Sequence, residues 1–292
     1  FGNIQKMRKH LETDRQILWV TYYRNLYNAT HPSEINSPVS LSRNLLAWNQ
    51  PGTNGLILPV NPSASFLSIL FANELWFTLG DMTMAEHCAM LSMIFSPRNS
   101  GSRMIKRLAE INLVNGDDEA ALKYLRILDK TLLHKSWAEK RIPGQQTPRV
   151  KEWLEKKRRD IPTQDQLRSG NDAVTSLQNL VASNAGNLRA YEYLLCYHLL
   201  SKDLRSFVED YVPGKVSSPI FAEALLIHLA RQGNIRAEEL IKYQIPVEIA
   251  KEFADYTRLY EAKDTSLKEK YGKTYWFYYH FATTEPGKES KP

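Results

Sequence analysis

Two stretches of the sequence decide its fold: residues 69–97 read ILFANELWFTLGDMTMAEHCAMLSMIFSP, and residues 105–128 read IKRLAEINLVNGDDEAALKYLRIL. Each contains an apolar ladder at helical spacing, then a Gly-Asp pair, at Gly80-Asp81 and at Gly116-Asp117, and then an alanine five residues after the glycine. Glycine ends a helix at little cost because it accepts a positive φ, and aspartate can cap the next helix. The two neighbourhoods match at a separation of 36 residues, which predicts a repeated helix–turn–helix unit.

This unit resembles the tetratricopeptide repeat, a pair of helices of about 34 residues. Two looser units follow, one turning at Lys202-Asp203, with Phe207 where a small residue is usual, and one turning at Gly233-Asn234. No segment shows a sustained β alternation. We therefore expect an all-α fold, a tetratricopeptide-like helical-repeat array (an α-α superhelix) of about eleven or twelve helices.

We expect residues 1–292 to form a single helical-repeat domain. Helices at about 9–28 and 38–48 supply an N-terminal pair, and additional helices at 147–159 and 171–183 fill the long spacing before the third unit. In chain order the parts are the clearest repeats at about 66–97 and 102–133, a basic insertion at about 134–183, looser repeats at about 187–213 and 219–246, and a C-terminal cap at 247–292.

Composition favours a folded, soluble chain, with 43% hydrophobic and 24% charged residues. No window approaches the roughly 18 apolar residues that a membrane helix needs. The net charge of +6 comes from residues 134–159, which hold nine basic and three acidic side chains beside Pro143, Gly144 and Pro148. We interpret this stretch as a solvated connector and polar helix face, and we expect no nucleic-acid partner.

No catalytic motif is present: the sequence lacks a glycine-rich phosphate loop, HExxH, CxxC and GxSxG. Adjacent His87 and Cys88 point about 100° apart on a helix and do not face each other, so we interpret them as packing residues rather than as a nucleophile and its base. Cys88 and Cys196 are expected to be buried free thiols, although a disulfide stays open, and His198 is expected to be a core histidine. We predict no enzyme activity, no cofactor and no metal site.

Arg103, Lys106 and Arg107 are the first candidate binding residues. They lie on the first helix of the second unit, where tetratricopeptide proteins can hold the terminal carboxylate of a peptide. Such a clamp would place asparagine four residues after Lys106, but this chain has Glu110 there and Glu74 in the first unit. The predicted carboxylate clamp is therefore incomplete.

The second candidate is the aromatic run at 271–281, in which Trp276 and Tyr278 could form an exposed platform for a protein or a glycan. The alternative is that this run covers the apolar end of the array. The stretch Asn49–Gly55 is interpreted as an irregular connection rather than a binding loop.

Several segments together resemble an uncharacterised family of Bacteroidetes proteins, in which a membrane-embedded N-terminal part precedes a tetratricopeptide-like C-terminal part. They are Leu41–Leu45, Asn54–Leu56, Lys106–Gly116, Lys123–Arg126 and Tyr271–Trp276. The resemblance implies the helical fold and no activity or site residue. Because the chain opens on Phe1-Gly2, we expect a fragment whose natural N-terminus has been removed. The resemblance implies that the removed part was membrane-associated.

We therefore expect a non-catalytic scaffold of the bacterial envelope that binds a protein or peptide, anchored at the membrane with this domain outside the cytoplasm. The alternative is a glycan- or nutrient-binding protein on the same kind of scaffold. Both rest on what helical-repeat scaffolds do rather than on a recognised site.

Overall fold

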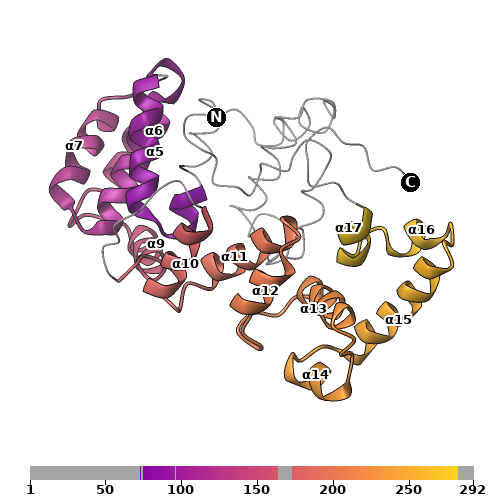
Figure 1. Ribbon diagram of the computed structural model, residues 1–292. Coiled ribbons are helices and arrows are strands. Elements are labelled where there is room, and N and C mark those ends of the chain that lie inside the picture. The colour runs from indigo at the N-terminus through magenta and orange to yellow at the C-terminus, as the bar shows by residue number, and fades with distance from the viewer. Residues whose placement is uncertain (1–72, 74, 96, 164–172, 282–292) are drawn as a thin grey trace. The chain divides into compact units, whose positions relative to one another are not determined.

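The computed structural model describes residues 73, 75–95, 97–163 and 173–281 (Figure 1). These ranges contain helices and no strand, which confirms the all-α class for the described residues. The helices expected at about 9–28 and 38–48, the stretch Asn49–Gly55 and Glu74 lie outside them. The helices are α5 (Met82–Phe95), α6 (Pro97–Asn115), α7 (Asp118–Asp129), α8 (Lys135–Glu139), α9 (Pro148–Arg158), α10 (Ala173–Ser183), α11 (Leu188–Leu200), α12 (Leu204–Asp210), α13 (Pro219–Arg231), α14 (Ala237–Lys242), α15 (Val247–Glu261), α16 (Leu267–Tyr271) and α17 (Tyr275–Phe281).

Contacts divide the chain into two compact units, with the division inside α11. One unit lies within Pro59–Tyr191, and the described part of the other lies within Glu192–Pro292. Whether both belong to one continuous repeat array stays a prediction. None of the described helices is both long enough and apolar enough to cross a membrane.

One turn geometry recurs in both units. Gly80 and Gly116 have φ values of +92° and +82°, and the amide of the following aspartate donates to the carbonyl oxygen five residues earlier, at 2.9 Å in both turns. The same combination of a positive φ and a bond that spans five residues occurs at Lys202, Gly233, Gln244 and Lys263. This bond satisfies a carbonyl at the end of the helix, which would otherwise have no partner.

At three of these turns the residue after the positive φ is an aspartate that caps the next helix. The Asp117 carboxylate accepts from the amide of Ala120 at 2.9 Å, and Asp81 accepts from Met84 at 3.0 Å. Asp203 makes the same bond to Ser206 at 3.0 Å, although a lysine precedes it instead of a glycine. The sequence-based turns at these three positions are confirmed.

In the unit within Pro59–Tyr191, α6 packs against α5, α7 and α9. Ala85 and Ala121, the small residues of the two repeats, are fully buried and let neighbouring backbones approach closely. The core along α6 has two clusters of buried residues: Ala89, Met104 and Leu108, and Ala109, Leu125, Leu128 and Ala138. The short helix α8, which supplies Ala138, was not predicted from the sequence.

In the unit within Glu192–Pro292, α13 packs against α12, α15 and α17. Phe207 is fully buried at the position where the repeat pattern expects a small residue, and its ring lies 5.8 Å from that of Phe221. The large side chain therefore fills space between α12 and α13. This explains why the third unit departs from the repeat pattern.

Candidate functional site

The predicted clamp residues occupy one stretch of α6, which runs beside α5 and α7 in Figure 1. Arg103 is exposed, whereas Lys106 and Arg107 are half-buried. The neighbouring Met104 and Leu108 point into the core, and this holds the basic side chains on an adjacent stripe of the helix. Of the three predicted residues, Lys106 and Arg107 are therefore the ones whose side chains are partly enclosed by the fold.

Arg107 lies between an aromatic ring and a carboxylate. Its guanidinium carbon is 3.7 Å from the centroid of the Phe77 ring, and Nη1 is 3.2 Å from the Glu110 carboxylate. Both contacts restrain the side chain, because cation–π attraction and a hydrogen-bonded ion pair each favour one rotamer. Glu110, which replaces the asparagine of a peptide clamp, is thus the internal partner of Arg107.

Lys106 shares a second ring with a residue from the basic insertion. Its Nζ is 5.2 Å from the Trp137 ring centroid, and the Arg141 guanidinium carbon is 4.0 Å from the same centroid. Burial lowers the pKa of Lys106, Glu110 raises it, and the positive charge of Arg141 lowers it further. Burial also lowers the pKa of Arg141. The two cations therefore repel each other across one tryptophan.

Lys157 is one of the residues of this region, with Arg141 and Arg189, that the sequence-based candidates did not include. Its Nζ donates to the Phe77 carbonyl at 3.1 Å and lies 4.5 Å from the centroid of the Phe77 ring. Burial lowers the pKa of Lys157 to about 8, and the charges of Arg189 and Arg107 add to this, while Asp160 and Glu110 oppose it. The cations around Lys157 thus outweigh the nearby carboxylates.

The basic insertion is consequently not a fully solvated face, contrary to expectation. Arg158 donates from Nε to the Val114 carbonyl at 3.0 Å and from Nη2 to the Leu113 carbonyl at 2.8 Å, at the C-terminal end of α6. Basic side chains are favourable at this end of a helix, where carbonyls lack partners. The signal was present in α9, because Lys157 follows the buried Val150 and Leu154 at helical spacing.

We call Lys106, Arg107, Arg141, Lys157 and Arg189, with the rings of Phe77 and Trp137, the basic cluster. All its members belong to the unit within Pro59–Tyr191. Its cations come from α6, α9, α11 and the residues after α8, so only the tertiary fold assembles it. Its chemistry suits an anion, with guanidinium forks for a carboxylate and aromatic faces beside them.

The C-terminal aromatic run lies in the core of the other unit. Trp276 is 0% exposed and Tyr278 is 7% exposed. The Trp276 indole donates to the Glu223 carbonyl at 3.0 Å, and the Tyr278 hydroxyl donates to the Leu200 carbonyl at 2.7 Å. This burial contradicts an exposed platform at these two positions and agrees with the alternative that α17 covers neighbouring helices.

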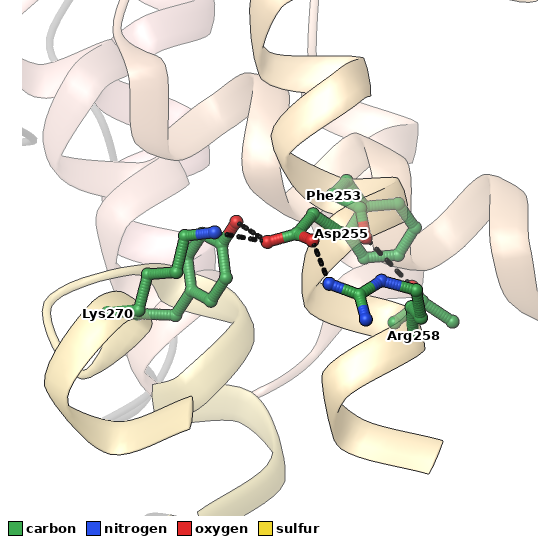
Figure 2. Close-up of polar contacts among 6 residues, drawn as sticks. Phe253, Asp255, Arg258 and Lys270 are labelled. Carbon is green, nitrogen blue, oxygen red and sulfur yellow. Dashed lines mark hydrogen bonds and ion pairs between the residues drawn. The ribbon is translucent and has the colours of Figure 1, made fainter. Parts of the chain in front are cut away.

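A second polar network joins α15 to α16, as Figure 2 shows. The Asp255 carboxylate accepts from Lys270, from Arg258 at 2.6 Å and from the Tyr271 hydroxyl at 2.7 Å. The bonds from Lys270, Arg258 and Tyr271 hold the pKa of Asp255 well below its ordinary value. Because protein donors already surround this carboxylate, it stabilises the packing of α16 and is a poor candidate for an acid or base.

The remaining reactive side chains are in structural environments. Cys88 and Cys196 are buried free thiols, as expected, and burial raises the pKa of Cys88 to about 11. His198 is buried and its Nε2 lies 2.9 Å from the Asp210 carboxylate, which fits the predicted core histidine. Among the described residues, no three His, Cys, Asp or Glu side chains are grouped so that they could hold a metal ion.

Comparison with known proteins adds a family. No curated protein and no solved structure matches the chain. One family model matches residues 19–282, which include all of the described residues and the whole basic cluster. The chain therefore belongs to the family described as "Family of unknown function (DUF6057)".

Proposed function

We propose that this chain is a non-catalytic, tetratricopeptide-like scaffold that binds a protein or peptide partner by a carboxylate at the basic cluster. The observation that carries the proposal is the gathering of cations on two rings. Arg107 and Lys157 lie 3.7 and 4.5 Å from the centroid of the Phe77 ring, and Arg141 and Lys106 lie 4.0 and 5.2 Å from the centroid of the Trp137 ring. The recurrent turn geometry and the packing of α6 against α5 and α7 support the repeat architecture. Repeat scaffolds present such clusters on extended binding surfaces.

A bound carboxylate would relieve the repulsion within the basic cluster. Protonated Lys157 attracts the anion, whereas the neutral amine does not, so affinity is expected to fall as the pH rises through about 8. Arg107 and Arg141 keep their charge in this range and supply forked donors. The rings of Phe77 and Trp137 are already in contact with these cations and lie beside the bound carboxylate.

The test is binding of the full chain to an array of peptides that end in a free carboxylate, followed by calorimetry of the best peptide. We expect the C-terminally amidated form of the same peptide to bind at least tenfold more weakly, and affinity to fall between pH 7 and pH 9. Lys157→Met should remove this pH dependence. Lys123→Gln, which removes an exposed cation on α7, is the matched control and should change little. Equal binding of the free and amidated peptides would refute the proposal.

The location of the protein in the bacterial envelope, anchored at the membrane with this domain outside the cytoplasm, is part of the same proposal. It rests on the family resemblance of the sequence rather than on the geometry of the basic cluster. Fractionation of cells that produce the natural protein, with protease added to intact spheroplasts, tests it. Protection of the domain from protease until the cells are lysed would place it on the other side of the membrane.

A further inference from the structure

Leu132 and Leu133, between α7 and α8, are the most exposed large hydrophobic side chains in the described ranges, at 97% and 84%. Ile127, on the last turns of α7, is also exposed. Exposed single leucines are ordinary on a protein surface, but two adjacent ones with almost their whole surface exposed are costly in water. Such a pair indicates a surface that is covered in the functional state.

The turn that carries these leucines is well defined. The Thr131 hydroxyl donates to the Leu128 carbonyl at 2.7 Å, and the amides of His134 and Lys135 donate to the Thr131 carbonyl at 3.3 and 3.1 Å. Leu128 on one side and Ala138 on the other are buried in one core cluster. The backbone is therefore fixed at both ends of the turn. The two leucines cannot fold back onto the core without breaking the hydrogen bonds of this turn.

The surroundings of the two leucines are basic. Residues 126–141 contain five Lys and Arg side chains and two acidic ones, Asp129 and Glu139. Arg126, Lys130, Lys135 and Lys140 are exposed, and Lys135 lies 3.9 Å from Glu139. This combination matches a lipid surface, where anionic headgroups lie above an apolar layer.

We propose that the turn Thr131–His134 docks the chain on an anionic lipid bilayer, with Leu132 and Leu133 inserted below the headgroups and the surrounding cations at their level. A bilayer fits better than a protein partner because the leucines project with almost their whole surface free. A fluid apolar layer accepts such a projection without a matching pocket. Protein hot spots are instead enriched in aromatic residues and arginine that fill a shaped site. The proposal is independent of peptide binding at the basic cluster.

Flotation of the full chain with vesicles tests the docking. We expect binding to vesicles of phosphatidylcholine with about one third phosphatidylglycerol, weak binding to pure phosphatidylcholine, and release by salt. The double variant Leu132→Ser with Leu133→Ser should lower the partition coefficient tenfold or more. The double variant Lys130→Glu with Lys135→Glu should lower it to a similar extent. Ile241→Ser removes another exposed apolar side chain, in the other unit, and is the matched control that should bind normally.

Three outcomes would overturn the proposal. The first is no binding of the natural sequence to anionic vesicles. The second is equal binding by the leucine variant, with circular dichroism showing that the variant is folded. The third is that light scattering shows a dimer for the natural sequence and a monomer for the leucine variant, while neither protein binds vesicles. That result would assign the leucines to an interface between two copies of the chain.

Discussion

Replacing Gly80 by alanine should destabilise the protein far more than the same change at Gly116, although the two glycines occupy the same place in the repeat. Both have a positive φ, +92° and +82°, which alanine adopts at a cost of about 1 kcal/mol. A Cβ at Gly116 would meet no atom within 4 Å. A Cβ at Gly80 would lie 2.2 Å from the carbonyl oxygen of Asp160 and 2.7 Å from its carbonyl carbon.

The overlap at Gly80 cannot be relieved by a side-chain rotation, because the atoms in the way belong to the backbone. The Asp160 carbonyl also accepts from Nδ2 of Asn187 at 2.8 Å, so a shift of this carbonyl weakens a partly buried hydrogen bond. Forced overlap in a packed interior costs about 1–3 kcal/mol. We therefore expect Gly116→Ala to cost about 1 kcal/mol and Gly80→Ala about 2–4 kcal/mol.

Urea unfolding, followed by far-ultraviolet circular dichroism and by tryptophan fluorescence, measures both values. The two probes must give coincident transitions for the free energies to be comparable. Gly233→Ala is a further control in the other unit, since Gly233 has a φ of +63° and open space around it. If Gly80→Ala costs no more than the two control variants, the close approach of Asp160 to Gly80 is refuted.

Two further predictions concern buried polar groups. Burial raises the pKa of Glu223 to about 7, although the amide of Tyr275 donates to its carboxylate. The folded state therefore binds a proton more tightly than the unfolded chain, and stability should fall by at most about 3 kcal/mol as the pH rises from about 4.5 to above 7. Glu223→Gln should flatten this dependence, measured as urea midpoints at pH 5 and pH 8, and an unchanged slope would contradict the buried carboxyl. Asn187 donates to the carbonyls of Leu79 and Asp160, at 2.7 and 2.8 Å, and Asn187→Ala should cost about 2–4 kcal/mol because one buried and one partly buried carbonyl lose their donor. Asn187→Asp keeps the oxygen that caps α11 but loses the amide donors. We expect it to lose about as much stability as the alanine variant in the same unfolding assay. Full retention of stability would show that the two bonds donated by Asn187 contribute little.

The sequence predicted the local structure better than the site. Helix ends were readable at Gly80 and Gly116, and the turn at Lys202 was found because Asp203 caps the next helix. The turn at Lys263 was not identified as one of this kind, although a Lys-Asp pair marks it as at Lys202 and its backbone makes the same bond. A stabilising hydrogen bond can thus hold a lysine at positive φ, and glycine alone does not identify such turns.

The candidate site was only partly predictable for a different reason. Lys106 and Arg107 could be chosen from their place in the repeat, but the cations beside them come from distant parts of the chain. Lys157 reaches Phe77 across 80 residues, and no periodicity connects the two. Trp276 was predicted as a possible surface residue and is buried in the core. An aromatic run in a sequence is compatible with either location until the segments that pack against it are known.

The sequence by itself determined the all-α class, the turns at Gly80 and Gly116, and the caps at Asp81 and Asp117. These depend on backbone conformation and on bonds between residues a few positions apart. Only the tertiary structure decided that Gly80 faces the Asp160 backbone whereas Gly116 has open space beside it. The two turns are alike locally, and they differ because the backbone of a residue distant in the sequence, Asp160, approaches one of them and not the other.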